Sequence, residues 1–296
     1  MGQLLPDYSR SRITEWIRQG QVQIDGVLPK PRHKTHGGEA IELQIPLEPL
    51  TEVSAEPLPL DIVHEDEALI ILDKPPGLVV HPAAGHWSGT LQNALLAHCP
   101  DLSRVPRSGI VHRLDKDTSG LLMVAKTLES HKQLVAQLQA RSVKREYLAL
   151  LMGWPVSGGT LNEPIGRHPT DRKRFAVRPD GKTAITHFRI EERFRHHTLA
   201  RVKLETGRTH QIRVHLAHAG YPLVGDPVYG GRSRLPAKAN PELLLALKAF
   251  RRQALHAAVL GLSHPMSGED LEWQAPIPPD FESLLDQLRE KEPACM

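Results

Sequence analysis

The sequence of 296 residues predicts an α+β fold in which a mixed, largely antiparallel sheet is flanked by helices. Many short apolar segments with strand-like alternation are joined by brief turns, and they do not alternate regularly with helices as they would around a parallel sheet. A proline-rich segment, residues 46–59, separates a small N-terminal module, residues 1–45, from a large domain, residues 60–296. The large domain is long enough to bury a full hydrophobic core.

The N-terminal module has the pattern of a helix, a strand, a basic loop and a second strand. Ser9 or Ser11 can cap a helix that ends at Gly20, and apolar residues then alternate over 22–24 and 41–45. Six basic and two acidic side chains lie between residues 10 and 36, the basic ones being Arg10, Arg12, Arg18, Lys30, Arg32 and Lys34. This pattern resembles the S4 RNA-binding domain, which has a further helix in front, so we expect an N-terminally incomplete module.

Apolar periodicity and turn residues predict the elements of the large domain. Thr209 would cap a helix that Gly220 ends, and Ser267-Gly268 would close a late hairpin. Strands are expected at 60–64, 68–72, 121–125, 143–151, 183–190, 199–205, 257–262 and 271–273. Helices are expected at 90–98, 128–140, 209–220 and 281–290.

Basic residues are concentrated in the middle of the chain, although the net charge is only +3. Residues 101–220 hold 22 Lys and Arg against 11 Asp and Glu, whereas residues 51–100 hold one against seven. This distribution is typical of a protein that binds a polyanion, because neutralising phosphates releases their counterions. From charge alone, a solvated basic face without a partner explains the pattern equally well.

Composition excludes several other classes of protein. No apolar run approaches the roughly 18 residues that a membrane helix needs, and Met1 to Pro6 do not resemble a signal peptide. Cys99 and Cys295 are the only cysteines, which excludes a disulfide scaffold and a cysteine-based zinc site. We therefore expect a cytoplasmic protein that has no membrane partner.

The first segment that could carry chemistry is the polar loop from Gly109 to Gly120, which lies between two apolar strands. Its Asp115 has basic neighbours, and an arginine partner would keep this carboxylate ionised so that it can act as a nucleophile or a base. The same residue types also form ordinary turns, in which Asp115 and Thr118 cap backbone amides.

The second segment, residues 206–216, predicts a basic helix that follows a glycine-containing loop. Arg213 lies off the apolar stripe of this helix, where its guanidinium could pair with a buried carboxylate or a phosphate. A basic surface helix is the alternative. No metal is expected, because no acidic or cysteine ligand and no usual zinc spacing accompanies His210, His215 and His218.

Two further segments stand out. The strand at 143–151 places Arg145 and Tyr147 on one face, and Tyr147 could be a core residue or could stack on a base in a pocket. Residues 72–82 predict a strand, a rigid proline turn and a second strand, in which Lys74 and His81 could contact a phosphate.

Together, these four segments resemble those of a known family. His112-Arg113-Leu114-Asp115, followed by Thr118-Ser119-Gly120, resembles the signature of the pseudouridine synthases, in particular the group that acts on ribosomal large-subunit and transfer RNA. The likeness runs from about residue 60 to 280. It implies a mixed sheet with the active cleft along its face, and an enzyme that uses no metal and no cofactor.

The resemblance also implies a role for each matching residue. Asp115 matches the catalytic aspartate, Tyr147 the tyrosine that packs on the target base, and Arg213 the basic residue that pairs with the aspartate. Arg113 matches the arginine that fills the space left by the displaced uridine. Further RNA contacts are expected from His112, Arg208, His210 and Lys74, and from Arg10, Arg12 and Lys34 of the N-terminal module.

The expected reaction isomerises specific uridines of 23S ribosomal RNA, and nothing is added or lost. By resemblance the substrate is the stem-loop of helix 69, in free RNA or in the assembling large ribosomal subunit, and the enzyme is a monomer. Other ribosomal or transfer RNA sites are an alternative. Two other classes stay open: a magnesium-dependent phosphotransferase built on Asp115 and Asp117, and a non-catalytic RNA-binding or ribosome-assembly factor.

Overall fold

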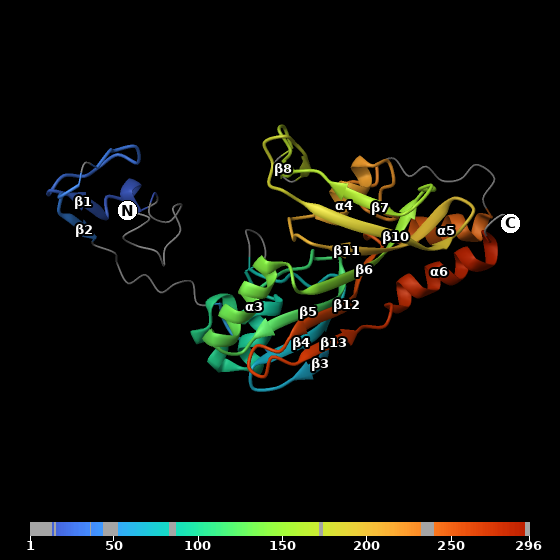
Figure 1. Cartoon of the computed structure of the whole chain (residues 1–296), viewed down its shortest axis with the longest axis horizontal. Helices are drawn as coiled ribbons and strands as arrows, with labels where there is room; N and C mark the ends of the chain where they lie inside the picture. The colour runs from blue at the N-terminus through green and yellow to red at the C-terminus, as the bar shows by residue number, and fades with distance from the viewer. Residues whose placement is uncertain are drawn as a thin grey trace. The chain divides into compact units, whose positions relative to one another are not determined.

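The computed structural model describes residues 14, 16–35, 37–43, 53–82, 87–171, 174–231 and 240–293. These residues belong to two compact units, one within residues 1–52 and one within residues 53–296 (Figure 1). Among the helices of these described residues, none is long and apolar enough to cross a membrane.

The N-terminal unit is built on one helical turn and one hairpin. Residues 16–18 are helical, and β1 (Val22–Ile24) pairs antiparallel with β2 (Ile41–Leu43). Trp16 and Val22 are buried against each other and form the small core of this unit. Both strands and the described part of the helix lie where the sequence predicts them, whereas the predicted caps Ser9 and Ser11 lie outside the described residues. The resemblance to the S4 domain stays a prediction.

The second unit contains a nine-stranded sheet, which confirms the predicted mixed and largely antiparallel architecture. Every neighbouring pair in it is antiparallel except β5 and β12. The strands, in spatial order, are β3 (Ile62–Glu65), β4 (Leu69–Lys74), β5 (Ser119–Ala125), β12 (Leu255–Ser263), β6 (Lys144–Met152), β11 (His197–Leu204), β10 (Ile185–Arg193) and β7 (Gly159–Asn162), with β13 (Asp270–Gln274) beside β12.

The parallel contact between β5 and β12 joins the two halves of the sheet. It is short, with Ser119 and Gly120 opposite His256 and Ala257, and β13 occupies the rest of that edge of β12. Gly120 has a φ of 107°, and a Cβ at this position would lie 2.3 Å from the carbonyl oxygen of Ala257. Only glycine allows this approach of the two backbones.

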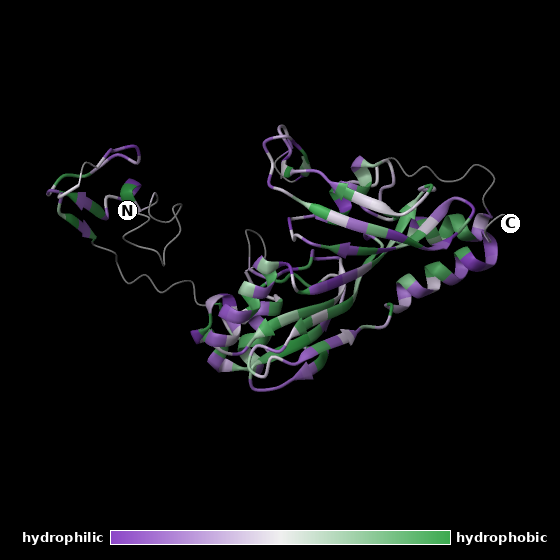
Figure 2. Ribbon diagram, viewed as in Figure 1, coloured by the Kyte–Doolittle hydropathy of each residue, from purple (hydrophilic) through white to green (hydrophobic). Residues whose placement is uncertain are grey.

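Helices cover both faces of the sheet. Alternate strand residues point to opposite faces. Ile70 and Leu72 therefore belong to one apolar cluster with residues of α2 (Leu91–His98) and α4 (Gln211–His218), while Leu69 and Ile71 belong to another with residues of α3 (Leu128–Ala140). Further along the sheet, a separate apolar cluster forms with α5 (Pro241–Ala249) and α6 (Pro279–Lys291). Figure 2 shows the resulting contrast between largely hydrophobic central strands and mixed outer helices.

Local signals set the helix boundaries. Thr90 caps α2 with a reciprocal bond to Asn93, and Thr127 accepts the backbone N–H of Ser130 at the start of α3. The predicted cap at Thr209 is wrong: the N-cap of α4 is the next residue, His210, which adopts a left-handed conformation with a φ of 56°.

The predicted linker over 46–59 ends earlier than expected, because residues 53–59 belong to the second unit. Asn93 Nδ2 donates to the carbonyl of Ser54 over 2.8 Å, and the backbone N–H of Glu56 donates to the carbonyl of Asn93 over 3.0 Å. The unit also contains elements that the sequence did not predict, namely α5, β7 and the small pair β8 (Ile165–Arg167) and β9 (Phe175–Val177).

Candidate active site

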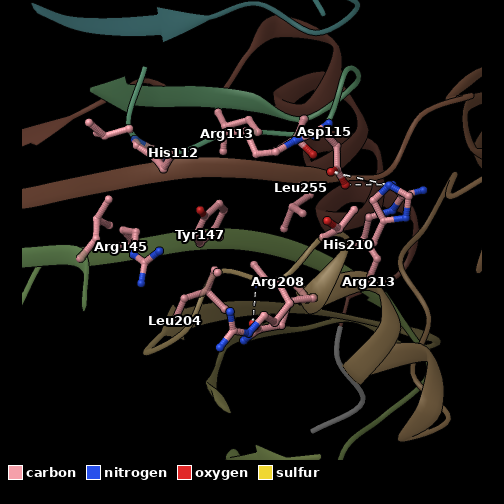
Figure 3. A pocket seen from close by; sticks show the side chains of 18 of the residues that line it. His112, Arg113, Asp115, Arg145, Tyr147, Leu204, Arg208, His210, Arg213 and Leu255 are labelled. Carbon is pink, nitrogen blue, oxygen red and sulfur yellow. Dashed lines mark hydrogen bonds and ion pairs between the residues drawn. The ribbon is translucent and has the colours of Figure 1, made fainter. Parts of the chain in front are cut away.

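A cavity of about 350 Å³ lies in the second unit, and most of the predicted site residues line it. Its wall comes from the loop before β5, from β6, and from α4 with the loop that precedes it, so distant parts of the chain meet there. Figure 3 shows Asp115 and Arg213 together, Arg145 farther along the cavity, and Tyr147 between them.

The loop that carries Asp115 is fixed by hydrogen bonds at its backbone and at Thr118. The backbone N–H of Thr118 donates to the carbonyl of Asp115 over 3.1 Å, and Gln253 Nε2 donates to Thr118 Oγ1 over 3.0 Å. Arg252 Nη1 donates to the carbonyl of Asp117 over 3.2 Å. The loop is therefore a turn, as one interpretation expected, but the Asp115 carboxylate takes no backbone amide among the described residues and faces the cavity instead.

The structure corrects the predicted role of Lys74. Its side chain is 1% exposed, and its Nζ donates to the carbonyls of Pro75, Leu78 and Lys116 over 2.7, 3.1 and 2.9 Å. Burial lowers the pKa of Lys74 to about 8. Because the three donors of this ammonium are satisfied inside the protein, Lys74 supports the loop of Asp115 and does not reach a phosphate.

Arg213 lies between two carboxylates. Its Nη1 donates to Asp115 Oδ2 over 2.9 Å, while its Nε and Nη2 donate to the two oxygens of Asp226 over 2.7 and 2.9 Å. Although burial opposes the charge, both carboxylates raise the pKa of Arg213 above its ordinary value. Asp226 is buried, yet Arg213 and the amides of Val228 and Tyr229 lower its pKa. Arg213 is thus a fixed cation that bridges Asp115 and the buried Asp226.

His210 approaches the other oxygen of Asp115. Its Nε2 lies 3.8 Å from Asp115 Oδ1, and its Nδ1 lies 2.9 Å from the hydroxyl of Tyr229. That hydroxyl also accepts the backbone N–H of Phe175. Burial lowers the pKa of His210, which favours the neutral ring.

Tyr147 and Arg145 project from β6 into the same cavity, and both are buried. Burial raises the pKa of Tyr147, so its hydroxyl is protonated at neutral pH. His112 lines the cavity as well, and its Nε2 accepts the backbone N–H of Met123 over 3.0 Å. Burial, with the charge of Arg145 nearby, lowers the pKa of His112 to about 3, so this ring is neutral.

The remaining predicted RNA contacts have different positions. Arg113 and Arg208 are exposed at the cavity, and Arg208 Nε donates to the carbonyl of Thr183 over 3.0 Å. Lys34 is exposed on the N-terminal unit. Arg10 and Arg12 lie outside the described residues.

The sequence analysis missed several residues of the site. Asp226 and Tyr229, which hold Arg213 and His210, come from a segment rich in turn residues that carries no periodic signal. Arg145 was placed on the face of Tyr147 without a role, although a charged residue on a buried strand face was a usable signal. His81, by contrast, was considered as a phosphate contact together with Lys74, and it lines the cavity.

Comparison with known proteins agrees with this site. Residues 68–218 match the family described as RNA pseudouridylate synthase, and the chain belongs to this family. It is therefore an isomerase that acts on RNA, so the phosphotransferase and the non-catalytic factor are not supported.

Individual relatives and solved structures are also similar to this chain. The chain is 57% identical over 288 residues to the ribosomal large subunit pseudouridine synthase D of Pseudomonas aeruginosa. The aligned residues cover 97% of this chain and 90% of the relative. It is 53% identical over 290 residues to the protein of the same name from Escherichia coli K12, covering 98% and 89%. Among solved structures, human RNA pseudouridylate synthase domain containing 4 matches with a TM-score of 0.61 and 25% identity, over 77% of this chain and 93% of that one.

Proposed function

We propose that this protein converts specific uridines of 23S ribosomal RNA to pseudouridine, and that Asp115 is its catalytic carboxylate. The substrate class is supported by relatives that are more than half identical over nearly the whole chain and are named for the large ribosomal subunit. The finer target is the stem-loop of helix 69, reached in free RNA or in the assembling subunit by a monomeric, cytoplasmic enzyme.

The observation that carries the proposal is the pair formed by Asp115 and Arg213, at 2.9 Å, beside a cavity that Tyr147 also lines. Isomerisation breaks the N-glycosidic bond, turns the uracil and joins it again through carbon. An ionised carboxylate with restricted access to water is suited to attack the nucleotide or to take a proton from it. The phenol ring of Tyr147 offers a surface on which the extruded base can pack.

The exposed arginines at the cavity are suited to the RNA backbone and to the gap in the helix. Extruding a base costs a few kcal/mol, and a side chain that occupies the vacated position offsets part of this cost. We assign that role to Arg113, which is exposed on the loop that carries Asp115. We assign phosphate or base contacts to Arg208, His112 and His210, and we propose that residues 1–45 form an S4-like module that adds affinity through basic residues such as Lys34.

Mapping pseudouridine in large-subunit RNA tests the function. Cells that lack the protein should lose specific pseudouridines, and wild-type protein should restore them whereas Asp115→Asn should not. The purified protein should modify an isolated helix 69 stem-loop, with a transfer RNA stem-loop as the comparison substrate. An unchanged map in the deletion strain, or full activity of Asp115→Asn, would refute the proposal.

A further inference from the structure

Arg145 is a buried cation that has no carboxylate partner among the described residues. Its side chain is 6% exposed on β6, and its Nη2 donates only to the backbone carbonyl of Glu205, over 3.1 Å. The carboxylate of Glu205 is bound to Arg141 and His187, at 2.9 and 2.7 Å. The carboxylate of its chain neighbour Glu146 lies near two other cations, Lys144 and Arg201. A buried guanidinium is costly to desolvate, so the absence of a counter-charge calls for an explanation.

One edge of this guanidinium is open to the cavity. Nε is buried without a hydrogen-bond partner. Nη1 has no hydrogen bond among the described residues and is not one of the buried atoms that lack a partner, so it is accessible, and it lies beside Gly207. A Cβ at residue 207 would come within 3.0 Å of Nη1, so the missing side chain keeps this nitrogen accessible. Figure 3 shows the guanidinium of Arg145 turned toward the side of the cavity where Arg208 lies.

The surroundings favour an anion at this position. Arg107 and Arg208 line the same cavity and are exposed, and the pKa of His112 is lowered partly by the charge of Arg145. The anionic group of an RNA is its phosphodiester, and a guanidinium binds phosphate oxygens through two parallel N–H donors. Uracil carbonyls would accept the same donors but would leave the charge of Arg145 unbalanced.

The position of Arg145 relative to Tyr147 places the phosphate close to the target uridine. The two residues are two apart on one strand, so their Cα atoms are separated by about 7 Å on the same face. We infer that Arg145 binds a backbone phosphodiester that flanks the target uridine, and that Gly207 leaves the space for it. This inference rests on the proposed function, in which Tyr147 packs on the target base.

The experiment measures binding and conversion of helix 69 stem-loops in which single phosphates around the target uridine are replaced by neutral methylphosphonates. Wild-type protein should lose about tenfold in affinity for one flanking methylphosphonate and stay within about twofold for distant ones. Arg145→Gln should bind the unmodified RNA about tenfold more weakly and should show no further loss at that phosphate. The slope of log Kd against log salt should fall by about 0.7 in this variant.

Matched variants separate the inferred contact from a general loss of charge. Arg145→Lys keeps the charge and should keep the salt slope. Arg289→Gln removes one charge from a residue already bound to Glu192, Glu282 and Asp286, and should bind RNA like wild type. Thermal unfolding shows whether each variant is folded, and the methylphosphonate series on wild-type protein needs no variant.

Two outcomes would overturn the inference. One is wild-type affinity that is the same for every single methylphosphonate, and the other is an equal loss for wild type and Arg145→Gln at the flanking phosphate. Failure of the proposed function gives a different result, namely no pseudouridine in the unmodified stem-loop with wild-type protein. In that case an Arg145-dependent phosphate contact still supports the binding site.

Discussion

Asp226 binds Arg213 through both of its oxygens, at 2.7 and 2.9 Å, and leaves one nitrogen of the guanidinium for Asp115. The two carboxylates therefore differ in role. The Asp226 side chain is fully buried, whereas that of Asp115 is 16% exposed at the cavity. Asp226 orients Arg213, and Arg213 in turn presents Asp115.

We expect Asp115→Asn to abolish pseudouridine formation while the affinity for RNA stays within a few-fold of wild type. The amide removes the reactive charge but keeps the shape and one acceptor for Arg213. Because Arg213 keeps Asp226 as its partner, the free energy of unfolding should change by no more than about 1 kcal/mol. Single-turnover conversion, filter binding and chemical denaturation check the three parts, and measurable conversion by the variant would contradict the assignment.

Asp226→Asn, unlike Asp115→Asn, should lower the stability of the protein strongly. Removing one charge from a buried, doubly bonded ion pair costs about 3 kcal/mol of stability. The variant should also convert uridine more slowly, because the guanidinium that orients Asp115 loses its fixed position. Denaturant unfolding and single-turnover rates measure both effects. A variant as stable as wild type would show that Asp226 does not hold Arg213 in solution.

Tyr147→Phe should bind RNA within about twofold of wild type but convert uridine at least about tenfold more slowly. The ring that packs on the base is retained, while the buried hydroxyl is lost as a proton donor, and such groups contribute about 10²–10⁴ to a rate. Burial raises the pKa of Tyr147, so wild type presents the protonated hydroxyl. An unchanged rate would leave packing against the base as the only role of this residue.

Arg113→Ala should impair base extrusion more than binding. Arg113 forms no hydrogen bond or ion pair within the described part of the chain, so its loss should leave stability within about 0.5 kcal/mol. A fluorescent base analogue next to the target uridine reports extrusion, and its signal should fall although Kd rises less than about threefold. A stem-loop in which the target uridine is already unstacked should recover most of the rate, and no recovery would count against the role.

The neutral ring of His112 predicts a specific pH dependence of stability. Its pKa is about 3 in the folded protein, below the ordinary value of 6.5. As the pH falls below 6.5, the unfolded chain therefore binds a proton that the folded protein does not, and stability drops by up to about 1.4 kcal/mol per pH unit. From pH 7 to pH 5 the wild-type free energy of unfolding should fall by about 2 kcal/mol more than that of His112→Gln, which keeps an acceptor for Met123. Equal falls would contradict the neutral ring of His112.

Sequence periodicity predicted those helices and strands that bury one face and whose signals lie within their own segment. The helix α3 has the predicted bounds because its apolar stripe and its cap at Thr127 are both encoded within the segment itself. The edge strand β7 was missed because its short sequence is mostly exposed and has no alternation. For α5, the burial of Leu243 and Leu247 depends on α6, which is distant in the sequence.

Some residues of the candidate site could likewise be predicted from the sequence, and others could not. The structure brings together Asp115 and Arg213, which the sequence analysis had proposed from separate segments. The partners that fix them, Asp226 and Tyr229, could not be predicted, because their contacts depend on a turn whose position is set by tertiary packing. The burial of Lys74 could not be predicted from the sequence for a related reason. Its three acceptors are backbone carbonyls, which no side-chain pattern reveals.

The central place of β12 has a consequence for how the enzyme is made. β5, next to the loop of Asp115, and β6, which carries Tyr147, both pair with this strand, which begins at Leu255. A ribosome that has reached residue 254 has already produced every other residue lining the cavity, yet these residues still lack the strand that joins the two halves of the sheet. We therefore expect activity to begin only when synthesis is nearly finished, and shorter nascent chains to leave the RNA around them unmodified.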